Sequence, residues 1–339
     1  MLFGQVNPWA WQPHPEVWAL VLGIIGLGFY ATRVIGPKYA RHYHSQSAVK
    51  ELVGASVGAA GGSASLSSSA DSSSLPDAPE SDGEESDGEF EIVSTKQKKY
   101  FALGVFSLYL AADWPLHDIA EQYLYSLHMV QHMLITFFIP IFFLQATPEW
   151  LARLILGGGG QERTWLGKLA KPVTAGLIFN FLAGLSHWNG IVQTSFDSGA
   201  FHFTIHLVMF SSALLMWLPV LGPLPELRLS VPGQMIYLFL MSIIPTVPAG
   251  WLTFADNVVY PAYDIPTRVW GLSVIHDQQA AGAIMKIFGG LFLWSLIAIR
   301  FFTYAGAERE ADRNRRVVRT LTYSDVEAEF ERTTPPEIE

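Results

Sequence analysis

The chain has 339 residues, of which 50% are hydrophobic and only 15% are charged, and its mean hydropathy is +0.27. A soluble domain carries about 25% charged residues, so this composition excludes a typical soluble protein and indicates a membrane protein with several spans. The absence of cysteine excludes disulfides, thiolate metal sites and cysteine nucleophiles. The net charge of −9 arises from residues 51–91, which hold ten acidic residues and no Lys or Arg; without them, 20 acidic residues face 21 basic ones, and nothing predicts nucleic-acid binding.

Seven apolar segments follow one another along the chain, each near the length of about 20 residues that a helix needs to cross a bilayer. They lie at residues 17–35, 98–113, 122–145, 172–188, 200–221, 233–254 and 279–302. We therefore predict an all-α fold: a polytopic membrane helical bundle with seven transmembrane helices. The first segment begins among tryptophans and has no basic leader, which indicates an interfacial anchor rather than a signal peptide.

The apolar segments and the polar stretch between the first two divide the chain into four parts. Residues 1–45 are predicted to form an N-terminal transmembrane helix with its flank. Residues 46–95 are predicted to be a disordered acidic, Ser-rich linker, because their composition is too polar to form a buried core. Residues 96–304 form the six-helix membrane core, and residues 305–339 form a charged cytoplasmic tail.

The basic residues are distributed unevenly between the two sides of the predicted bundle. Nineteen of the 21 Lys and Arg residues fall in the loops and tail of one side, whereas Arg268 lies in a loop of the other side and Lys286 lies within the last span. Cytoplasmic loops carry the excess of Lys and Arg. We therefore predict a multi-pass protein of the cell (plasma) membrane with its N-terminus outside and its C-terminus in the cytoplasm.

Seven of the ten histidines fall at one depth of this topology, toward the outer face. Four of them form two i, i+4 pairs, His128 with His132 and His202 with His206, and residues with that spacing share one helix face. Ionisable residues in spans are costly and often mark ion, proton or metal sites. We expect the two pairs to face each other and the other three histidines to close the site from its outer rim. The candidate metal ligands are His117, His128, His132, His187, His202, His206 and His276.

Neutral imidazole suits copper, zinc, iron and nickel, and a metal-bound imidazole usually donates its other N–H to a carboxylate or carbonyl. Met129 and Met133 each follow a histidine, and thioethers favour Cu(I), although a methionine pair at helical spacing is also typical of packing. Lys286 is expected to form an ion pair or to extend toward the outer surface. The candidate carboxylate partners of the histidines are Asp113, Asp118, Glu121 and Asp277.

The stretch DWPLHDIAEQYLYSLHMVQHMLI at residues 113–135 resembles the CtaG-type, multi-span cytochrome c oxidase assembly factors. The resemblance covers the six-span core and continues in LSHWNG at 185–190, FHFTIHLVMFSSALLMWLPVLGP at 201–223 and HDQQAAGAIM at 276–285. It implies a protein without enzymatic activity that builds the haem-copper oxidase of the respiratory chain. The implied partners are cytochrome c oxidase subunits and the lipid bilayer, and the implied cargo is copper, handled on the outer side. The implied functional positions are His117, His128, His132, His187, His202, His206, Asp277 and Gln278.

Two alternative functions remain open from the residues alone. Imidazoles from facing helices could be the axial ligands of haem b in a membrane oxidoreductase. His and Asp residues could instead relay protons in a proton-coupled transporter, but the inner halves of the spans hold few ionisable groups for such a path. Zinc is the third candidate cofactor beside copper and haem b.

Overall fold

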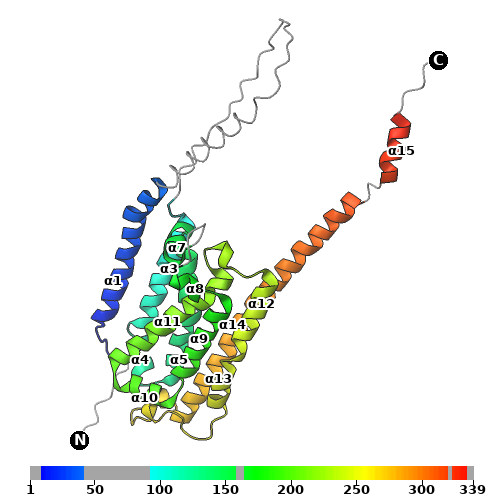
Figure 1. The fold of residues 1–339 in the computed structure, drawn as a ribbon. Coiled ribbons are helices and arrows are strands. Elements are labelled where there is room, and N and C mark those ends of the chain that lie inside the picture. The colour runs from blue at the N-terminus through cyan, green and yellow to red at the C-terminus, as the bar shows by residue number, and fades with distance from the viewer. Residues whose placement is uncertain (1–8, 42–91, 158–163, 320–322, 334–339) are drawn as a thin grey trace, which may run out of the picture.

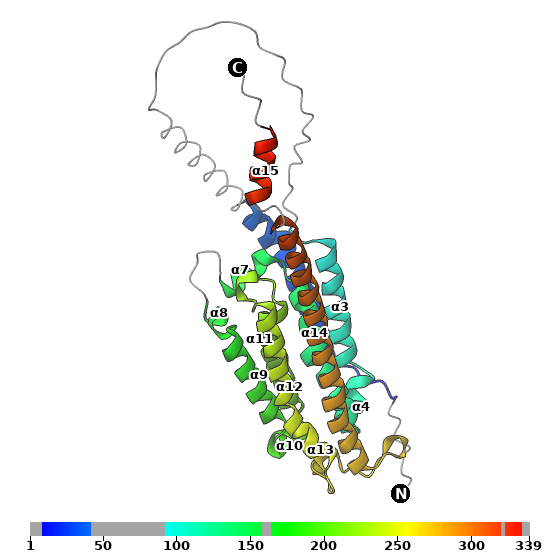
Figure 2. The ribbon, with the colours of Figure 1, turned by 90° about the vertical axis from the view of Figure 1, so that its right-hand side faces the viewer.

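The computed structural model describes residues 9–41, 92–157, 164–319 and 323–333. Every regular element in these ranges is a helix (Figures 1 and 2), which confirms the predicted all-α fold. Most of the predicted disordered linker lies outside the described residues. The α-helices are α1 Pro15–Tyr30, α3 Thr95–Ala112, α4 Leu116–Gln122, α5 Tyr125–Met133, α6 Ile139–Ala146, α7 Glu149–Leu156, α8 Trp165–Leu169, α9 Pro172–Ser186, α10 Asn189–Asp197, α11 Gly199–Leu221, α12 Val231–Ile243, α13 Thr246–Thr253, α14 Val274–Arg319 and α15 Tyr323–Thr333. The π-helical segments are η1 Ala31–Ile35 and η2 Leu134–Phe138, and the 3-10 turns are η3 Pro225–Leu227, η4 Pro261–Tyr263 and η5 Val269–Gly271.

Five of these helical stretches are long and apolar enough to cross a membrane, which supports a multi-pass membrane protein. They are Pro15–Arg41, Tyr125–Ala146, Gly199–Leu221, Val231–Thr253 and Val274–Arg315. The predicted count of seven is not confirmed. Of the other two predicted spans, α9 is apolar but has only 15 residues. The helix α3 carries three lysines in its first five residues, so its first turns are too polar to lie in the hydrocarbon core of a bilayer.

The long helices run side by side in one bundle (Figures 1 and 2). α5, η2 and α6 form one continuous helix at its centre, which packs against α3, α11 and α14, while α1 lies at the edge against α3. The outer face of α9 exposes Val173, Leu177 and Phe181 at i, i+4 spacing. Such a stripe of exposed large apolar side chains is suited to contact with lipid.

The central helix is irregular just after His132. Pro140 has no N–H to donate to the carbonyl of Thr136, four residues earlier. The Trp217 side chain of α11 donates its indole N–H to that carbonyl instead, at 2.9 Å. π-helical segments such as η2 often occur at functional sites. Here the hydrogen bond from Trp217 to the freed carbonyl of Thr136 connects the central helix to α11. This contact lies about one turn beyond His132 and fixes how the two helices are aligned.

A buried carboxylate from the last long helix fixes the start of α5. Asp277, in the first turn of α14, accepts the backbone N–H groups of Tyr125 (2.8 Å) and Ser126 (3.0 Å) and the Ser126 hydroxyl (2.6 Å). A negative charge at a helix N-terminus is stabilising. The neighbouring Gln278 exchanges two hydrogen bonds with the backbone of Tyr260. Both residues therefore organise the fold around the histidines through backbone contacts.

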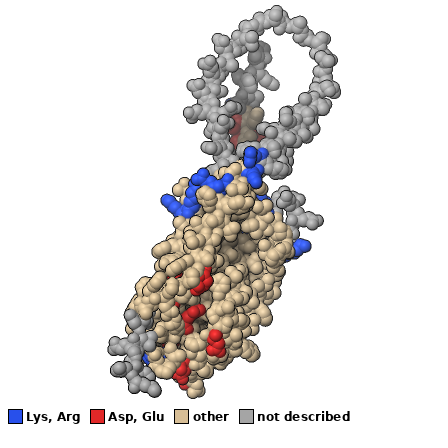
Figure 3. All heavy atoms as spheres, turned by 90° about the vertical axis from the view of Figure 1, so that its left-hand side faces the viewer, with Lys and Arg blue, Asp and Glu red and all other residues tan. Residues whose placement is uncertain are grey.

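Charge is separated along the bundle. On the face that Figure 3 shows, Lys and Arg gather at one end of the bundle, and the Asp and Glu of the bundle itself lie in its opposite half. α14 extends out of the bundle beyond the basic end (Figure 1). At 1.5 Å per residue its 46 residues span about 70 Å, roughly twice the hydrocarbon core of a bilayer. The predicted charged tail thus begins as a direct continuation of this helix.

Candidate metal centre

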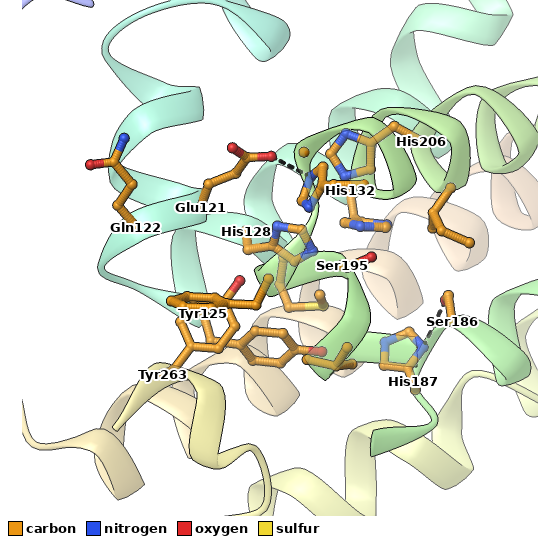
Figure 4. Close-up of a pocket in the computed structure, with 16 residues that line it drawn as sticks. Glu121, Gln122, Tyr125, His128, His132, Ser186, His187, Ser195, His206 and Tyr263 are labelled. Atoms are coloured by element: carbon orange, nitrogen blue, oxygen red, sulfur yellow. Dashed lines mark hydrogen bonds and ion pairs between the residues drawn. The ribbon is translucent and has the colours of Figure 1, made fainter. Parts of the chain in front are cut away.

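The structure brings the two histidine pairs together. The imidazole centroids lie 4.6 Å apart within the pair of α5 and 4.2 Å apart within the pair of α11. Between the helices, His206 lies 5.5 Å from His128 and 4.9 Å from His132. The short helices α4 and α10, which precede α5 and α11 in the chain, lie at the same end of the bundle (Figure 1), so the first turns of α5 and α11 lie at a similar height. Figure 4 shows His128, His132 and His206 close together at the pocket. The arrangement that the i, i+4 spacing predicted is therefore present.

The four imidazoles line a cavity of about 240 Å³, which we call the histidine cavity. One nitrogen from each of His128, His202 and His206 lies within 4.8 Å of the other two. Metal–nitrogen bonds are about 2 Å long, so an ion among these three nitrogens requires them to approach one another by roughly 1 Å. Small side-chain rotations provide such a movement. The three residues can therefore form the core of a metal site.

Several imidazole nitrogens at this cavity are buried and have no hydrogen-bond partner among the described residues, including His128 Nδ1, His206 Nε2 and His187 Nε2. Leaving a buried polar atom unpaired costs free energy, and a bound ion would remove that cost. The tautomer of His187 follows from its other contact. Its Nδ1 lies 2.7 Å from the carbonyl of Ala183, and a carbonyl only accepts, so Nδ1 carries the proton. The Nε2 lone pair of His187 is therefore free to bind a metal.

Glu121 of α4 connects two histidines at the edge of the cavity. Its carboxylate oxygens lie 2.9 Å from His202 Nε2 and 3.3 Å from His117 Nε2. Burial raises the pKa of Glu121, but the hydrogen bond and charge of His202 outweigh it, and the net pKa is lowered. Burial lowers the pKa of His117. A carboxylate in contact with imidazoles orients them as ligands, so Glu121 occupies the position that the sequence predicted for such an acceptor.

His276 does not close the rim of the cavity, which corrects the expectation for this residue. Its side chain is exposed, and its backbone N–H bonds to the Ser273 hydroxyl. Successive residues of a helix point about 100° apart. The side chain of Asp277 points inward, to the start of α5. The side chain of His276, one residue earlier in α14, therefore points away from the bundle.

Asp113 and Asp118 bind the N-terminal segment rather than the four clustered histidines. Asp113 accepts the indole N–H of Trp18 at 3.0 Å, and Asp118 lies 2.6 Å from His14 Nε2. Burial lowers the pKa of His14, but its contacts with Asp118 and Glu16 outweigh burial and raise it. His14 was not predicted to lie near the histidine cluster; its position among the interfacial tryptophans was the one signal that placed it at the outer face.

Lys286 does not form the expected ion pair with any carboxylate among the described residues. Its Nζ donates to the hydroxyl of Thr246 in α13 at 2.6 Å. The aromatic wall of the histidine cavity was also not predicted from the sequence. Tyr125 stacks on His128 with ring centroids 5.6 Å apart, and Tyr263 of η4 lies 6.5 Å from His128. No local pattern connects η4 to α5, which are far apart in the chain.

The comparisons with known proteins bear on the whole bundle. A family model described as cytochrome c oxidase caa3 assembly factor matches residues 86–306, which are 221 of the 339 residues. The match includes both histidine pairs and extends from α3 into α14. It agrees with the resemblance that the sequence motifs indicated. The comparisons with curated proteins and with solved structures found no match.

Proposed function

This chain belongs to the cytochrome c oxidase caa3 assembly factor family, and we propose that it contributes to assembly by binding copper in the histidine cavity and releasing it to the oxidase. Assembly of an oxidase is a non-enzymatic role, as the sequence predicted. One observation carries the copper proposal: three imidazoles from two helices, two of them buried and that of His206 half-buried, place their ligand nitrogens within 4.8 Å of one another.

The donor set favours copper over the alternative cofactors. Neutral imidazole is a ligand for copper in either oxidation state, and among divalent ions the general affinity order places copper above zinc and iron. The four imidazole rings contact one another directly, with centroids 4.2 to 5.5 Å apart. A haem would have to insert its macrocycle between two of them, so this packing argues against haem b. Zinc remains the second candidate metal.

The surroundings of the cavity suit binding and release. Glu121 holds His117 and His202 at the outer edge, and the Ala183 carbonyl holds His187. An ion bound by three imidazoles keeps a coordination position open toward the cavity, through which an acceptor ligand can attack it. Stepwise exchange of imidazoles for the ligands of the oxidase would then release the ion without a free intermediate in water.

For the topology, we propose seven spans in the plasma membrane, with α3 and α9 as the two shorter ones. The positive-inside rule assigns the basic end of the bundle (Figure 3) to the cytoplasm. The histidine cavity lies toward the other end, beside α4 and α10, and so faces the outer side. Reporter fusions test this orientation: a periplasmic reporter fused after Glu339 should be inactive, and an active one would reverse it.

The decisive experiment replaces ligands while leaving the bundle intact. We expect His132→Ala and His206→Ala to lower both the copper bound by the detergent-purified protein and the yield of mature oxidase in cells. His276→Ala is the matched control, since that imidazole is exposed, and it should leave both unchanged. Full copper binding and normal oxidase maturation in both variants would contradict the proposal. In the purified wild type, stoichiometric zinc would favour a zinc site, and a Soret band would favour haem b.

A further inference from the structure

A second cavity, of about 60 Å³, adjoins the histidine cavity and is lined largely by methionine. Six of the eight methionines in the chain are among its 19 lining residues. They come from four helices, α5, α11, α12 and α14, and each is between 1% and 8% exposed. We call this space the methionine cavity; its methionines are Met129, Met133, Met209, Met216, Met241 and Met285.

The two cavities share part of their walls. Met129, His132 and His187 line both of them. The Nε2 of His187 has a free lone pair at this boundary, because its Nδ1 is held by the Ala183 carbonyl. An ion in the histidine cavity is therefore separated from the methionine cavity by residues that are themselves nitrogen and sulfur donors.

We infer that the methionine cavity is a second copper site, selective for Cu(I). Thioether sulfur is a soft ligand that selects Cu(I) over divalent ions. A monovalent ion among neutral thioethers also pays a smaller desolvation cost than a divalent one, because the cost grows with the charge. The identity of the metal rests on the proposed function. No change of oxidation state is involved, since the ion enters and leaves as Cu(I).

Packing alone does not account for this arrangement. Methionine is flexible and usually fills irregular gaps in a core, yet here a gap persists among six of them. The thioether of Met241 is held in place: Asn180 donates its amide N–H to the sulfur at 3.0 Å. Gly176 leaves room for the same side chain, because a Cβ there would lie 2.9 Å from the methyl carbon of Met241.

A positive charge beside the cavity adds to the selectivity. Lys286 also lines it, with Nζ on the hydroxyl of Thr246. Coulomb repulsion is proportional to the charge of the bound ion, so this ammonium group opposes a divalent ion more strongly than Cu(I). Lys286 thereby gains a function that neither of the two expectations from the sequence assigned to it.

The test loads the full-length, detergent-purified protein with Cu(I) under anaerobic conditions and counts sulfur and nitrogen ligands by X-ray absorption. The wild type should show both kinds of ligand and bind more than one copper per chain. Met241→Leu combined with Met285→Leu conserves side-chain volume; it should remove the sulfur ligands and weaken Cu(I) binding at this site roughly tenfold or more. Met235→Leu is the control, because Met235 lies outside the cavity, and it should change neither.

The outcomes separate this inference from the proposed function. Absence of sulfur ligands in the wild type, or their persistence in the double variant, overturns the inference and leaves the histidine site standing. Sulfur ligands without nitrogen ligands remove the histidine site and leave the inference standing. His128→Ala with His206→Ala should retain sulfur-bound Cu(I), and its loss there would count against a separate site. Met209→Leu with Met216→Leu repeats the test from α11 if the first double variant fails to fold.

Discussion

The histidine cavity and the methionine cavity share a wall but differ in chemistry and in their supports. The histidine cavity lies in the first turns of α5 and α11, offers nitrogen donors and has a carboxylate at its edge. The methionine cavity is lined mainly by apolar and thioether groups from four helices. The bundle therefore places imidazole nitrogens, which are ligands of borderline softness, beside thioether sulfurs, which are soft ligands. Such a pair of neighbouring sites suits an ion that is passed on by ligand exchange rather than held permanently.

Replacing Asp277 should have the largest effect and should disturb both cavities, because both contain residues of α5. Asp277→Ala leaves the N–H groups of Tyr125 and Ser126 and the Ser126 hydroxyl unpaired in a buried place. We expect the free energy of unfolding to fall by about 3 kcal/mol or more, measured as a lower thermal midpoint in circular dichroism.

The control for this variant is Asp264→Ala, in an exposed loop, which should leave the midpoint unchanged. A normal midpoint for Asp277→Ala, together with loss of copper from the histidine cavity alone, would instead make Asp277 a direct part of that site.

Replacing Glu121 should separate the two cavities. Glu121→Gln keeps the shape of the side chain but removes the charge that faces His117 and His202. We expect the affinity of the histidine cavity for copper to fall by about 10- to 100-fold, while sulfur-bound Cu(I) persists in the X-ray absorption spectrum. Asp256→Asn, at an exposed position, serves as the matched control. An equal loss of nitrogen-bound and sulfur-bound copper would mean that the two cavities act as one site.

The smallest effect should come from the N-terminal segment, which reaches the histidine cavity only at its outer edge. The pKa of His14 is raised above its ordinary value of 6.5 in the folded protein. Its contact with Asp118 therefore stabilises the docked segment fully below about pH 6.5 and loses this contribution as the pH rises through the raised pKa. Hydrogen exchange near residues 14–18, corrected for the intrinsic rate, should become faster over that range.

His14→Gln removes the titrating group and should abolish the pH-dependent step in exchange. Copper binding should change less in this variant than in Glu121→Gln, since His14 contacts the ring of His117 but lies outside the cavity lining. A step of equal size in His14→Gln and in the wild type would assign the pH dependence to another group.

The sequence by itself determined the features that depend on local periodicity and composition. Apolar segments of spanning length predicted the helical membrane bundle. The i, i+4 spacing of His128 with His132, and of His202 with His206, placed each pair on one helix face, because a helix returns to the same side after about one turn. The equal depth of the two pairs followed from counting the spans, and α5 and α11 do start at the same end of the bundle, after α4 and α10 (Figure 1).

Only the tertiary structure decided which side chains meet across the bundle. It turned Asp277 inward and His276 outward, gave Glu121 two imidazole partners, and assigned Asp118 to His14. It also gathered six methionines from four helices, of which only Met129 and Met133 lie about one helical turn apart in the sequence. The physical reason is that periodicity specifies the face of a helix on which a residue lies, whereas the neighbour of that face depends on long-range packing, rotation and register of all the helices together.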